Sequence, residues 1–338
     1  CTVRRRKKHY LHYLQDPAAM STKTRFLIIR YSGLGDLVML LPTLQKLKIV
    51  YPESSFTLLT DSSNRDFANL SCGLIDDTIT LNRKVFKQKR FFSSIGEIGK
   101  MLFHIRKRFD ICIDFQSFGE TATISYLVNA KEKWGAEKKS KYNYGYTRLV
   151  PYDTSGHRSQ LFARIAGVDD TLSRPKICLT QNAEVFRQSV AATLDSSKPT
   201  VGLNIGSTSE SRRWSEQNFF QLASELSEHY TILVFIGPLE NRYKEVFQDF
   251  AIIENTTLEQ LCGAISLCSY FISNDTGPVH LAAALGIPTI TLFSTGEDTN
   301  VGCLNPYKRS LRRPDINAIS VTDVTDELKA LENDLILN

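Results

Sequence analysis

Short runs of apolar residues alternate along the chain with stretches whose apolar positions recur at helical spacing. The apolar runs predict strands at 26–30, 56–60, 78–81, 111–115, 201–205, 232–236, 251–254, 270–273 and 289–293. The stretches between them predict helices at 36–50, 94–108, 120–130, 216–228, 242–250, 258–267, 278–285 and 324–335. Apolar strands that alternate with helices are typical of a parallel sheet covered on both faces. The pattern therefore predicts an α/β protein.

Two series of such strands and helices follow one another, and we interpret them as two Rossmann-like parallel-sheet domains at residues 23–180 and 200–338. Residues 181–199 hold a helix followed by Ser196-Ser197-Lys198-Pro199, and are interpreted as a linker region. The last predicted helix follows the final strand of the second domain. The sequence leaves open whether it stays there or crosses back onto the first domain.

Composition and charge agree with a globular protein that has a basic tail. Hydrophobic residues make up 42% and charged residues 23% of the chain, and no apolar run is long enough to predict a membrane span. The net charge of +5 equals the charge of the basic run at residues 4–8. We expect residues 1–22 to be a disordered tail, with contact to an anionic membrane as the functional alternative. The body shows no stripe of basic and aromatic residues that would indicate a nucleic-acid partner.

Seven cysteines lie at positions 1, 72, 112, 178, 262, 268 and 303, without a CxxC pair. Several of them are surrounded by apolar residues, where free cysteine behaves as a small hydrophobic side chain. We therefore expect reduced thiols in a cytoplasmic protein, and neither a zinc site nor a disulfide framework.

The turn after the first predicted strand reads Tyr31-Ser32-Gly33-Leu34-Gly35-Asp36. Gly33 and Gly35 permit positive φ angles and the close approach of another molecule. The turn lies at the carboxyl end of a strand, where open α/β sheets bind ligands. Taken alone, this turn allows Asp36 to be a helix cap, part of a cofactor loop, or a general base that deprotonates a sugar hydroxyl.

A dinucleotide-binding loop is the competing interpretation of this turn, and it would make the chain an NAD-dependent oxidoreductase. Gly33 and Gly35 begin such a fingerprint, and Asp61 ends the next strand near the position of a ribose-binding acid. However, Val38 replaces the third glycine, and the carboxylate of Asp36 would lie where a pyrophosphate binds. Because a partial match is weak evidence, the oxidoreductase remains only the alternative function.

A second candidate site follows the predicted strand at 270–273, where Asp275-Thr276-Gly277-Pro278-Val279-His280 begins a helix. Pro278 suits the first helical turn, Asp275 or Thr276 can cap it, and Gly277 permits close approach. The N–H groups at a helix start can receive a diphosphate without a metal. The Thr276 hydroxyl and the His280 ring are further candidate donors.

Two loops at the same edge of the second predicted sheet add to this site. The loop after residue 205 carries Ser207, Thr208, Arg212 and Arg213, and guanidinium groups suit bidentate phosphate contacts. The loop after residue 236 carries Glu240, which can accept hydrogen bonds from ribose hydroxyls. The predicted nucleotide-sugar site comprises Arg212, Glu240, Asp275, Thr276, Gly277 and His280, with weaker contributions from Gly33, Gly35, Ser207, Thr208 and Arg213.

At these residues the sequence resembles glycosyltransferase family nine, the ADP-heptose:lipopolysaccharide heptosyltransferase family, across about residues 25–325. The matching segments are Arg30 to Asp36 with Leu41-Pro42, Phe109-Asp110 to Gln116, Ser211-Arg212-Arg213-Trp214, Gly237-Pro238-Leu239-Glu240, and Asp275 to Gly286. The resemblance implies a GT-B fold, in which two Rossmann-like domains face a central cleft. It places the acceptor mainly on the first domain and the nucleotide sugar on the second.

The resemblance also implies the chemistry. A sugar, heptose in the family, passes with inversion and without a metal or other cofactor from an ADP-linked donor to a hydroxyl of a lipopolysaccharide-core or related glycan acceptor. The position matched by Asp36 is the general base, and the family's anion cradle falls on Asp275, Thr276, Gly277 and His280. Its basic residue before the Trp falls on Arg212, and its ribose-binding acid on Glu240. Such enzymes belong to bacterial lipopolysaccharide biosynthesis in the cytoplasm, at the inner face of the membrane.

Two departures from the family pattern bear on the substrates. Glu120 stands where the family commonly has an arginine that favours a phosphorylated acceptor, and Ser294-Thr295-Gly296 replaces the usual Gly-Pro-Thr near the nucleotide. The acceptor is therefore left open. A catalytically silent relative that binds nucleotide or glycan is a further alternative to the enzyme.

Overall fold

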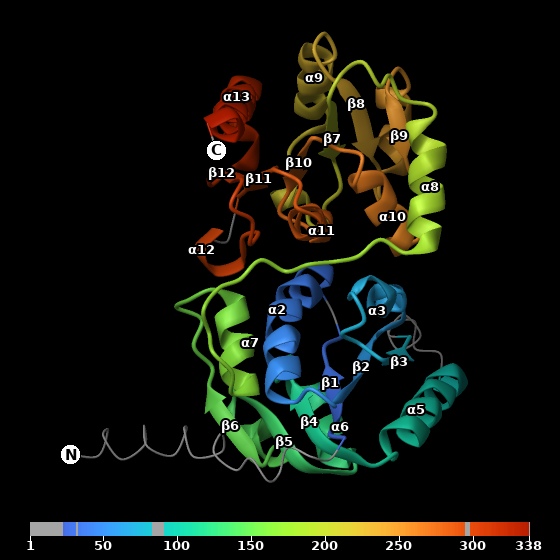
Figure 1. Ribbon diagram of the computed structural model, residues 1–338, viewed down its shortest axis with the longest axis vertical. Helices are drawn as coiled ribbons and strands as arrows, with labels where there is room; N and C mark the ends of the chain where they lie inside the picture. The colour runs from blue at the N-terminus through green and yellow to red at the C-terminus, as the bar shows by residue number, and fades with distance from the viewer. Residues whose placement is uncertain (1–22, 32, 83–90, 295–297, 338) are drawn as a thin grey trace, which may run out of the picture.

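The structure is a computed structural model that describes residues 23–31, 33–82, 91–294 and 298–337. It contains two parallel sheets of six strands, each covered by helices. In Figure 1 the domain of the second sheet lies above the domain of the first. The predicted tail at residues 1–22, with its alternative of membrane contact, lies outside the described residues. The GT-B class of fold, with two Rossmann-like domains, is confirmed.

The first sheet has the strand order β3-β2-β1-β4-β5-β6. Its strands are β1 (Arg25–Ile29), β2 (Ser55–Asp61), β3 (Asp77–Leu81), β4 (Phe109–Asp114), β5 (Ala130–Glu137) and β6 (Arg148–Pro151). Its helices are α2 (Leu34–Val50), α3 (Phe67–Leu70), α5 (Phe91–Ile105), α6 (Gly119–Leu127) and α7 (Arg158–Ala166), with short 3-10 turns η3 (Ser62–Asn64) and η4 (Ser140–Gly145).

The second sheet has the order β12-β11-β10-β7-β8-β9, which repeats the connectivity of the first. Its strands are β7 (Thr200–Asn204), β8 (Thr231–Phe235), β9 (Ala251–Ile253), β10 (Tyr270–Asn274), β11 (Thr289–Phe293) and β12 (Lys308–Arg312). Its helices are α8 (Gln181–Ala191), α9 (Glu216–Leu226), α10 (Leu258–Ile265), α11 (Gly277–Leu285), α12 (Asp298–Val301) and α13 (Val321–Leu337), with η5 (Glu210–Arg212), η6 (Asn241–Phe247) and η7 (Ile316–Ala318). In each sheet the chain reverses direction across the sheet between the first and fourth strands, the point where such folds bind ligands.

All nine predicted strands are present, but β5, β6 and β12 were missed. Lys, Arg and Glu interrupt β5 and β12, and β6 has only four residues. Since only part of each strand is buried, no continuous apolar run marks them. Helix α7 was also missed, and the helix predicted at 242–250 is the 3-10 segment η6. The helix at the start of the predicted linker, α8, packs on α10, and the terminal helix α13 packs on α9, β11 and β12 of the second sheet.

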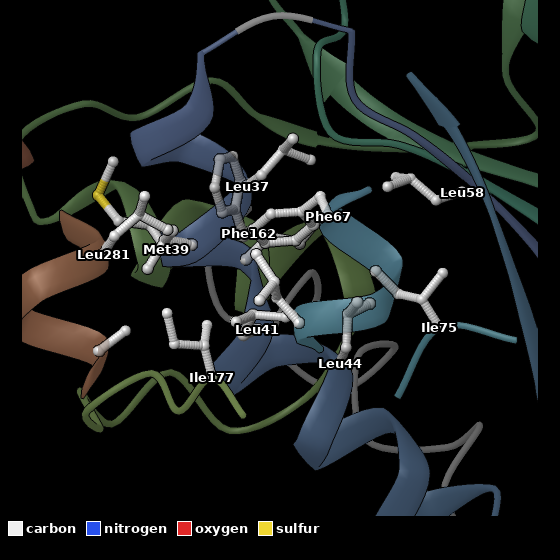
Figure 2. Close-up of a cluster of buried hydrophobic side chains, with 14 of the residues drawn as sticks. Leu37, Met39, Leu41, Leu44, Leu58, Phe67, Ile75, Phe162, Ile177 and Leu281 are labelled. Atoms are coloured by element: carbon white, nitrogen blue, oxygen red, sulfur yellow. The ribbon is translucent and has the colours of Figure 1, made fainter. Parts of the chain in front are cut away.

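One hydrophobic core passes from the first domain into the second. Helix α2 packs against α11, and the two helices face each other between the sheets in Figure 1. Figure 2 shows Met39 of α2 beside Leu281 of α11, with Phe162 of α7 behind the leucines of α2. Because interiors are close-packed and resist deformation, this shared core fixes the two strand edges that border the functional cleft.

A disulfide joins Cys72, just after α3, to Cys178, in the segment that leads into α8. The expectation of reduced thiols throughout was therefore wrong for this pair. The two residues are 106 positions apart with Cα atoms 5.1 Å from each other, and no spacing rule reveals such a pairing from one sequence. Cys112, Cys262, Cys268 and Cys303 are buried and form no disulfide. Burial raises the pKa of the Cys112 thiol to about 12, so it is unreactive at neutral pH.

The disulfide predicts the thiol count of the oxidised protein. Unfolded in denaturant without reductant, the chain should react with a thiol reagent at five of its seven cysteines, and at all seven after reduction. A Cys72→Ser/Cys178→Ser double variant should give five in both conditions. Seven reactive thiols in the unreduced wild type would show that the bridge does not form.

Candidate functional site

A cavity of about 810 Å³ lies between the carboxyl ends of strands from the two sheets. The first domain contributes the turn after β1 and the segment after β2, and the second domain contributes the loops after β7, β8 and β10. Predicted site residues that line it are Gly33, Gly35, Ser207, Thr208, Arg212, Glu240, Asp275, Thr276 and Gly277. Asp36, Arg213 and His280 are not among its lining residues. The loops chosen from the sequence therefore converge on one cleft between the domains.

Asp36 lies in the first turn of α2, next to the cleft, with its side chain 15% exposed. Its Oδ2 accepts a hydrogen bond from Nη2 of Arg30, and Nη1 of Arg158 lies 3.2 Å from its Oδ1. Gly33 is the N-cap of α2, and no side chain caps this helix start. The carboxylate of Asp36 is therefore oriented from two sides by cations.

Gly33 is needed for this arrangement. Its φ is +87°, a conformation that favours glycine. A Cβ at this position would also lie 2.5 Å from Oδ2 of Asp36. The turn therefore leaves room for the carboxylate.

Arg30 and Arg158 come from different parts of the chain. Arg30 follows β1, is buried, and donates from Nη1 to the Phe115 carbonyl at 3.0 Å, while its guanidinium lies over the Phe162 ring. Burial lowers the pKa of Arg30, and the attraction of Asp36 opposes this change. Arg30 stands in the family-like segment, but Arg158 begins the unpredicted helix α7 and follows Asp36 by 122 residues. No sequence pattern pointed to Arg158.

Two glycines of the site serve the contact between α2 and α11. A Cβ on Gly35 would lie 2.5 Å from the His280 ring, and one on Gly277 would lie 2.8 Å from Cβ of Leu34. The expected reason for these glycines was the approach of a ligand, whereas the structure shows the approach of another helix. His280 is buried against Gly35, and its role as a donor to the ligand stays a prediction.

The cradle at the start of α11 is held by neighbouring polar side chains. Thr276 is the N-cap, but its hydroxyl makes no capping hydrogen bond. Instead, Oγ1 accepts a hydrogen bond from the Asn204 amide at 3.0 Å, and Asp275 to Pro278 line the cavity. Asn204, at the end of β7, is a lining residue that was missed; its position at a strand's carboxyl end was the signal that could have found it.

Asn274 was also missed, and it fixes the loop that carries Arg212. It is fully buried; its side chain accepts a hydrogen bond from the Trp214 amide at 2.9 Å and donates to the Ile205 and Gly206 carbonyls. The Trp214 ring is fully buried as well and donates from Nε1 to the Ile319 carbonyl. Both ends of the loop are therefore anchored.

The adjacent Arg212 and Arg213 have different surroundings. Arg213 is buried, with Nη2 2.7 Å from Oε1 of Glu240 and 2.6 Å from the Ser207 carbonyl. Arg212 lines the cavity and donates to Oγ1 of Thr208. In the part of the chain that the structure describes, no acidic side chain forms an ion pair with Arg212. Of the two, Arg212 has the charge that an anion in the cavity can reach.

Glu240 presents one oxygen to the loop and the other to the glycines of the cleft. Oε1 accepts from the Ser207 amide at 3.2 Å as well as from Arg213. Oε2 lies 2.7 Å from the site where a Gly237 Cβ would stand and 3.4 Å from that of Gly206. Both glycines line the cavity, as Glu240 does, so Oε2 lies near the part of the cavity wall that they form.

Two further acids named from the sequence, Asp61 and Glu120, lie in different surroundings. Asp61 lines the cavity, but its Oδ1 accepts hydrogen bonds from the Ser63 amide and hydroxyl at 2.9 and 2.7 Å, which caps η3. Glu120 is exposed in the first turn of α6 and does not line the cavity. Among the described residues, no group of three or more His, Cys, Asp or Glu is placed to hold a metal ion.

Comparison with known proteins agrees with this geometry. Residues 98–330 match glycosyltransferase family 9 (heptosyltransferase). The chain belongs to this family. The predicted family, and with it the enzyme class of glycosyltransferase, is confirmed.

Individual members of the family are distant in sequence but similar in fold. The chain is 25% identical over 275 residues to lipooligosaccharide heptosyltransferase 2 of Campylobacter jejuni, covering 77% of each chain. The glycosyltransferase family 9 structure from Veillonella parvula superposes with a TM-score of 0.80 at 19% identity, covering 91% of this chain and 97% of the other. The Escherichia coli heptosyltransferase WaaC with ADP gives a TM-score of 0.76 at 19% identity, covering 91% and 100%.

Proposed function

We propose that this glycosyltransferase moves a heptose from ADP-heptose to a hydroxyl of a lipopolysaccharide-core or related glycan, with inversion and without a metal. The observation that carries the proposal is the placement of Asp36 beside the cleft, oriented by Arg30 and Arg158. The cleft also holds the anion cradle at the start of α11 and the guanidinium of Arg212. A base and an anion-stabilising group on opposite domains are what a displacement between two bound sugars requires.

The donor binds to the second domain in this proposal. The helix start at Gly277 and the Arg212 guanidinium receive the diphosphate, and Oε2 of Glu240 accepts hydrogen bonds from the ribose hydroxyls. Arg213 and Asn274 hold these groups in place without contacting the nucleotide. The related WaaC, which was solved with ADP, supports the choice of an adenine nucleotide.

The reaction is a direct displacement at the anomeric carbon. Asp36 takes the proton of the acceptor hydroxyl while the hydroxyl oxygen bonds to that carbon from the face opposite the nucleotide. The bond from the carbon to the diphosphate breaks, and ADP leaves with the negative charge. Arg212 and the α11 helix start stabilise this charge as it develops.

The acceptor and the cellular location are part of the proposal. Glu120, in place of the family's arginine, argues for an acceptor that does not rely on a phosphate at this position. We propose that the enzyme works in the cytoplasm at the inner membrane face, with residues 1–22 as one attachment to anionic lipid. None of the helices in the described ranges combines the length and apolarity that a membrane crossing needs.

A thermal-shift screen of nucleotides tests the donor assignment. ADP and ADP-linked sugars should raise the unfolding temperature more than UDP- or GDP-linked sugars, because a ligand at about 100 times its Kd adds roughly 2.7 kcal/mol to the folded state. A response to NADH without a response to ADP would overturn the proposal in favour of an oxidoreductase. Binding of ADP-heptose without transfer to any glycan of an acceptor panel would identify a catalytically silent relative.

A further inference from the structure

A strip of aromatic residues and lysines covers the outer side of α6 and η4. It comprises Phe118, Tyr126, Leu127, Tyr142 and Tyr144 with Lys133, Lys138 and Lys141, and we call it the aromatic–lysine strip. Tyr126 is 59% exposed and Tyr144 53% exposed, and Phe118 and Leu127 are exposed to a similar degree. The expectation that the body has no basic–aromatic stripe was therefore wrong.

The side chains of the strip are preorganised by contacts with one another and with α6. The rings of Phe118 and Tyr142 lie 6.1 Å apart, and those of Tyr126 and Tyr144 lie 5.9 Å apart. The Tyr144 hydroxyl is 2.7 Å from that of Thr123. Segment η4 also packs closely on α6: a Cβ on Gly145 would lie only 2.4 Å from the Ala122 carbonyl oxygen.

The face that carries the strip extends over α5. Met101 and Ile105 of α5 share a buried core with Ile124 of α6, so both helices cover the same face of the first sheet. On its outer side α5 exposes Phe103, which is 73% exposed, and three basic residues at 106–108 follow the helix. Both helices therefore expose apolar side chains on the outer side of this face of the first sheet.

The charge of the strip favours an anionic partner. Residues 126–145 contain five lysines and only two glutamates. Two copies of the chain would bring these lysines against each other, so like-charge repulsion disfavours self-association. An anionic lipid surface instead attracts each lysine, while tyrosine and phenylalanine are side chains that settle at the boundary between headgroups and acyl chains.

The geometry of the rings favours lipid over nucleic acid. Lysine ammonium groups already lie over the rings of Phe118, Tyr142 and Tyr126, at 5.1, 5.0 and 5.7 Å from the centroids. Bases bind such surfaces by stacking on open ring faces, and a lysine already lies over one face of each of these three rings. The exposed side chains of Leu127 and Phe103 can insert between acyl chains and form no hydrogen bonds.

We propose that the aromatic–lysine strip, with the neighbouring outer side of α5, docks the folded body on an anionic lipid bilayer. The strip begins at Phe118, four residues after the end of β4, so it starts at the strand edge that borders the cleft and runs away from it along α6. A bilayer bound there lies beside the first domain. This surface does not include the basic run at residues 4–8, and the proposal does not depend on the identity of the donor or the catalytic base.

Co-sedimentation with vesicles tests the proposal on the full chain. The wild type should bind phosphatidylcholine vesicles that contain phosphatidylglycerol and should not bind phosphatidylcholine alone. Lys138→Glu/Lys141→Glu should weaken this binding by about tenfold or more, and Phe103→Ser/Leu127→Ser should weaken it by several-fold. Lys244→Glu/Lys329→Glu, on exposed positions of the second domain, is the matched charge control and should bind like the wild type.

Two further measurements keep the result decisive. Substitution of the five basic residues at 4–8 by Gln should leave most of the vesicle binding. If this tail variant lost vesicle binding while the strip variants kept it, the membrane contact would belong to the tail and the proposal would be overturned. A thermal shift with ADP that matches the wild type shows that each variant is folded. Equal vesicle binding by wild type and strip variants, or a preference for a single-stranded oligonucleotide over anionic vesicles, would also refute it.

Discussion

Replacing Asp36 by Asn should lower turnover by a factor of about 10² or more while nucleotide binding is retained. The amide has nearly the same shape as the carboxylate, but it cannot take a proton from the acceptor hydroxyl. Arg30 and Arg158 lose the charge of their shared partner, and an unpaired buried guanidinium costs stability. The variant should therefore be compared with the wild type by kcat, by the ADP-induced thermal shift, and by its unfolding temperature without ligand.

Asp61→Asn is the matched control, because Asp61 is a second acid that lines the same cavity and caps η3. It should lose some stability and keep most of its turnover. If Asp36→Asn turned over at nearly the wild-type rate, Asp36 would not be the base. If Asp61→Asn were the inactive variant, the turn after β1 would have to be reinterpreted.

Replacing Arg212 by Gln should lower kcat/KM by about 10² to 10³, because removal of one preorganised donor to a developing negative charge typically costs this much. Arg212 lines the cavity, and its guanidinium donates a hydrogen bond to the Thr208 hydroxyl. The loss should therefore fall on the binding and departure of the diphosphate, with little effect on the free energy of unfolding. Steady-state kinetics with varied ADP-sugar, together with the affinity for ADP, separate the effect on diphosphate binding from the effect on its departure.

Arg242→Gln is the control for charge, since Arg242 is exposed and pairs with Glu210 beside the same loop. It should leave kcat/KM within about twofold, as expected for a surface ion pair. An unchanged kcat/KM in Arg212→Gln would remove the guanidinium from the mechanism. A large loss of stability instead would mean that Arg212 anchors the loop, the role that the structure gives to its neighbour Arg213.

The fold was predictable wherever burial was complete. The strands at the centre of each sheet, such as β1 and β10, are mostly apolar and almost entirely buried because helices cover both faces. β5 and β12 were missed because their exposed Lys, Arg and Glu side chains break the apolar run. Such strands are defined by backbone pairing with strands that are distant in sequence, and a local pattern of apolar residues does not reveal this pairing.

The candidate site was predictable as a set of loops and not as a set of contacts. Small and polar residues after buried strands pointed to the turns at Gly33, Ser207, Glu240 and Thr276, and all four turns line one cavity. The second cation on Asp36, from Arg158, depends on the packing of α7 and left no trace in the sequence around either residue. For the same reason, the sequence could not show that Gly35 accommodates a helix from the other domain.

The bond between Cys72 and Cys178 gives the polypeptide a closed covalent ring that contains β3 to β6 and α5 to α7. The strand that carries the Asp36 turn and the entire second domain lie outside this ring. A protease that cuts once between residues 73 and 177 therefore leaves a single covalent molecule, which separates into two fragments only on a reducing gel. The aromatic–lysine strip lies within the ring, so a nick next to it would not release the surface from the domains that bind the sugars.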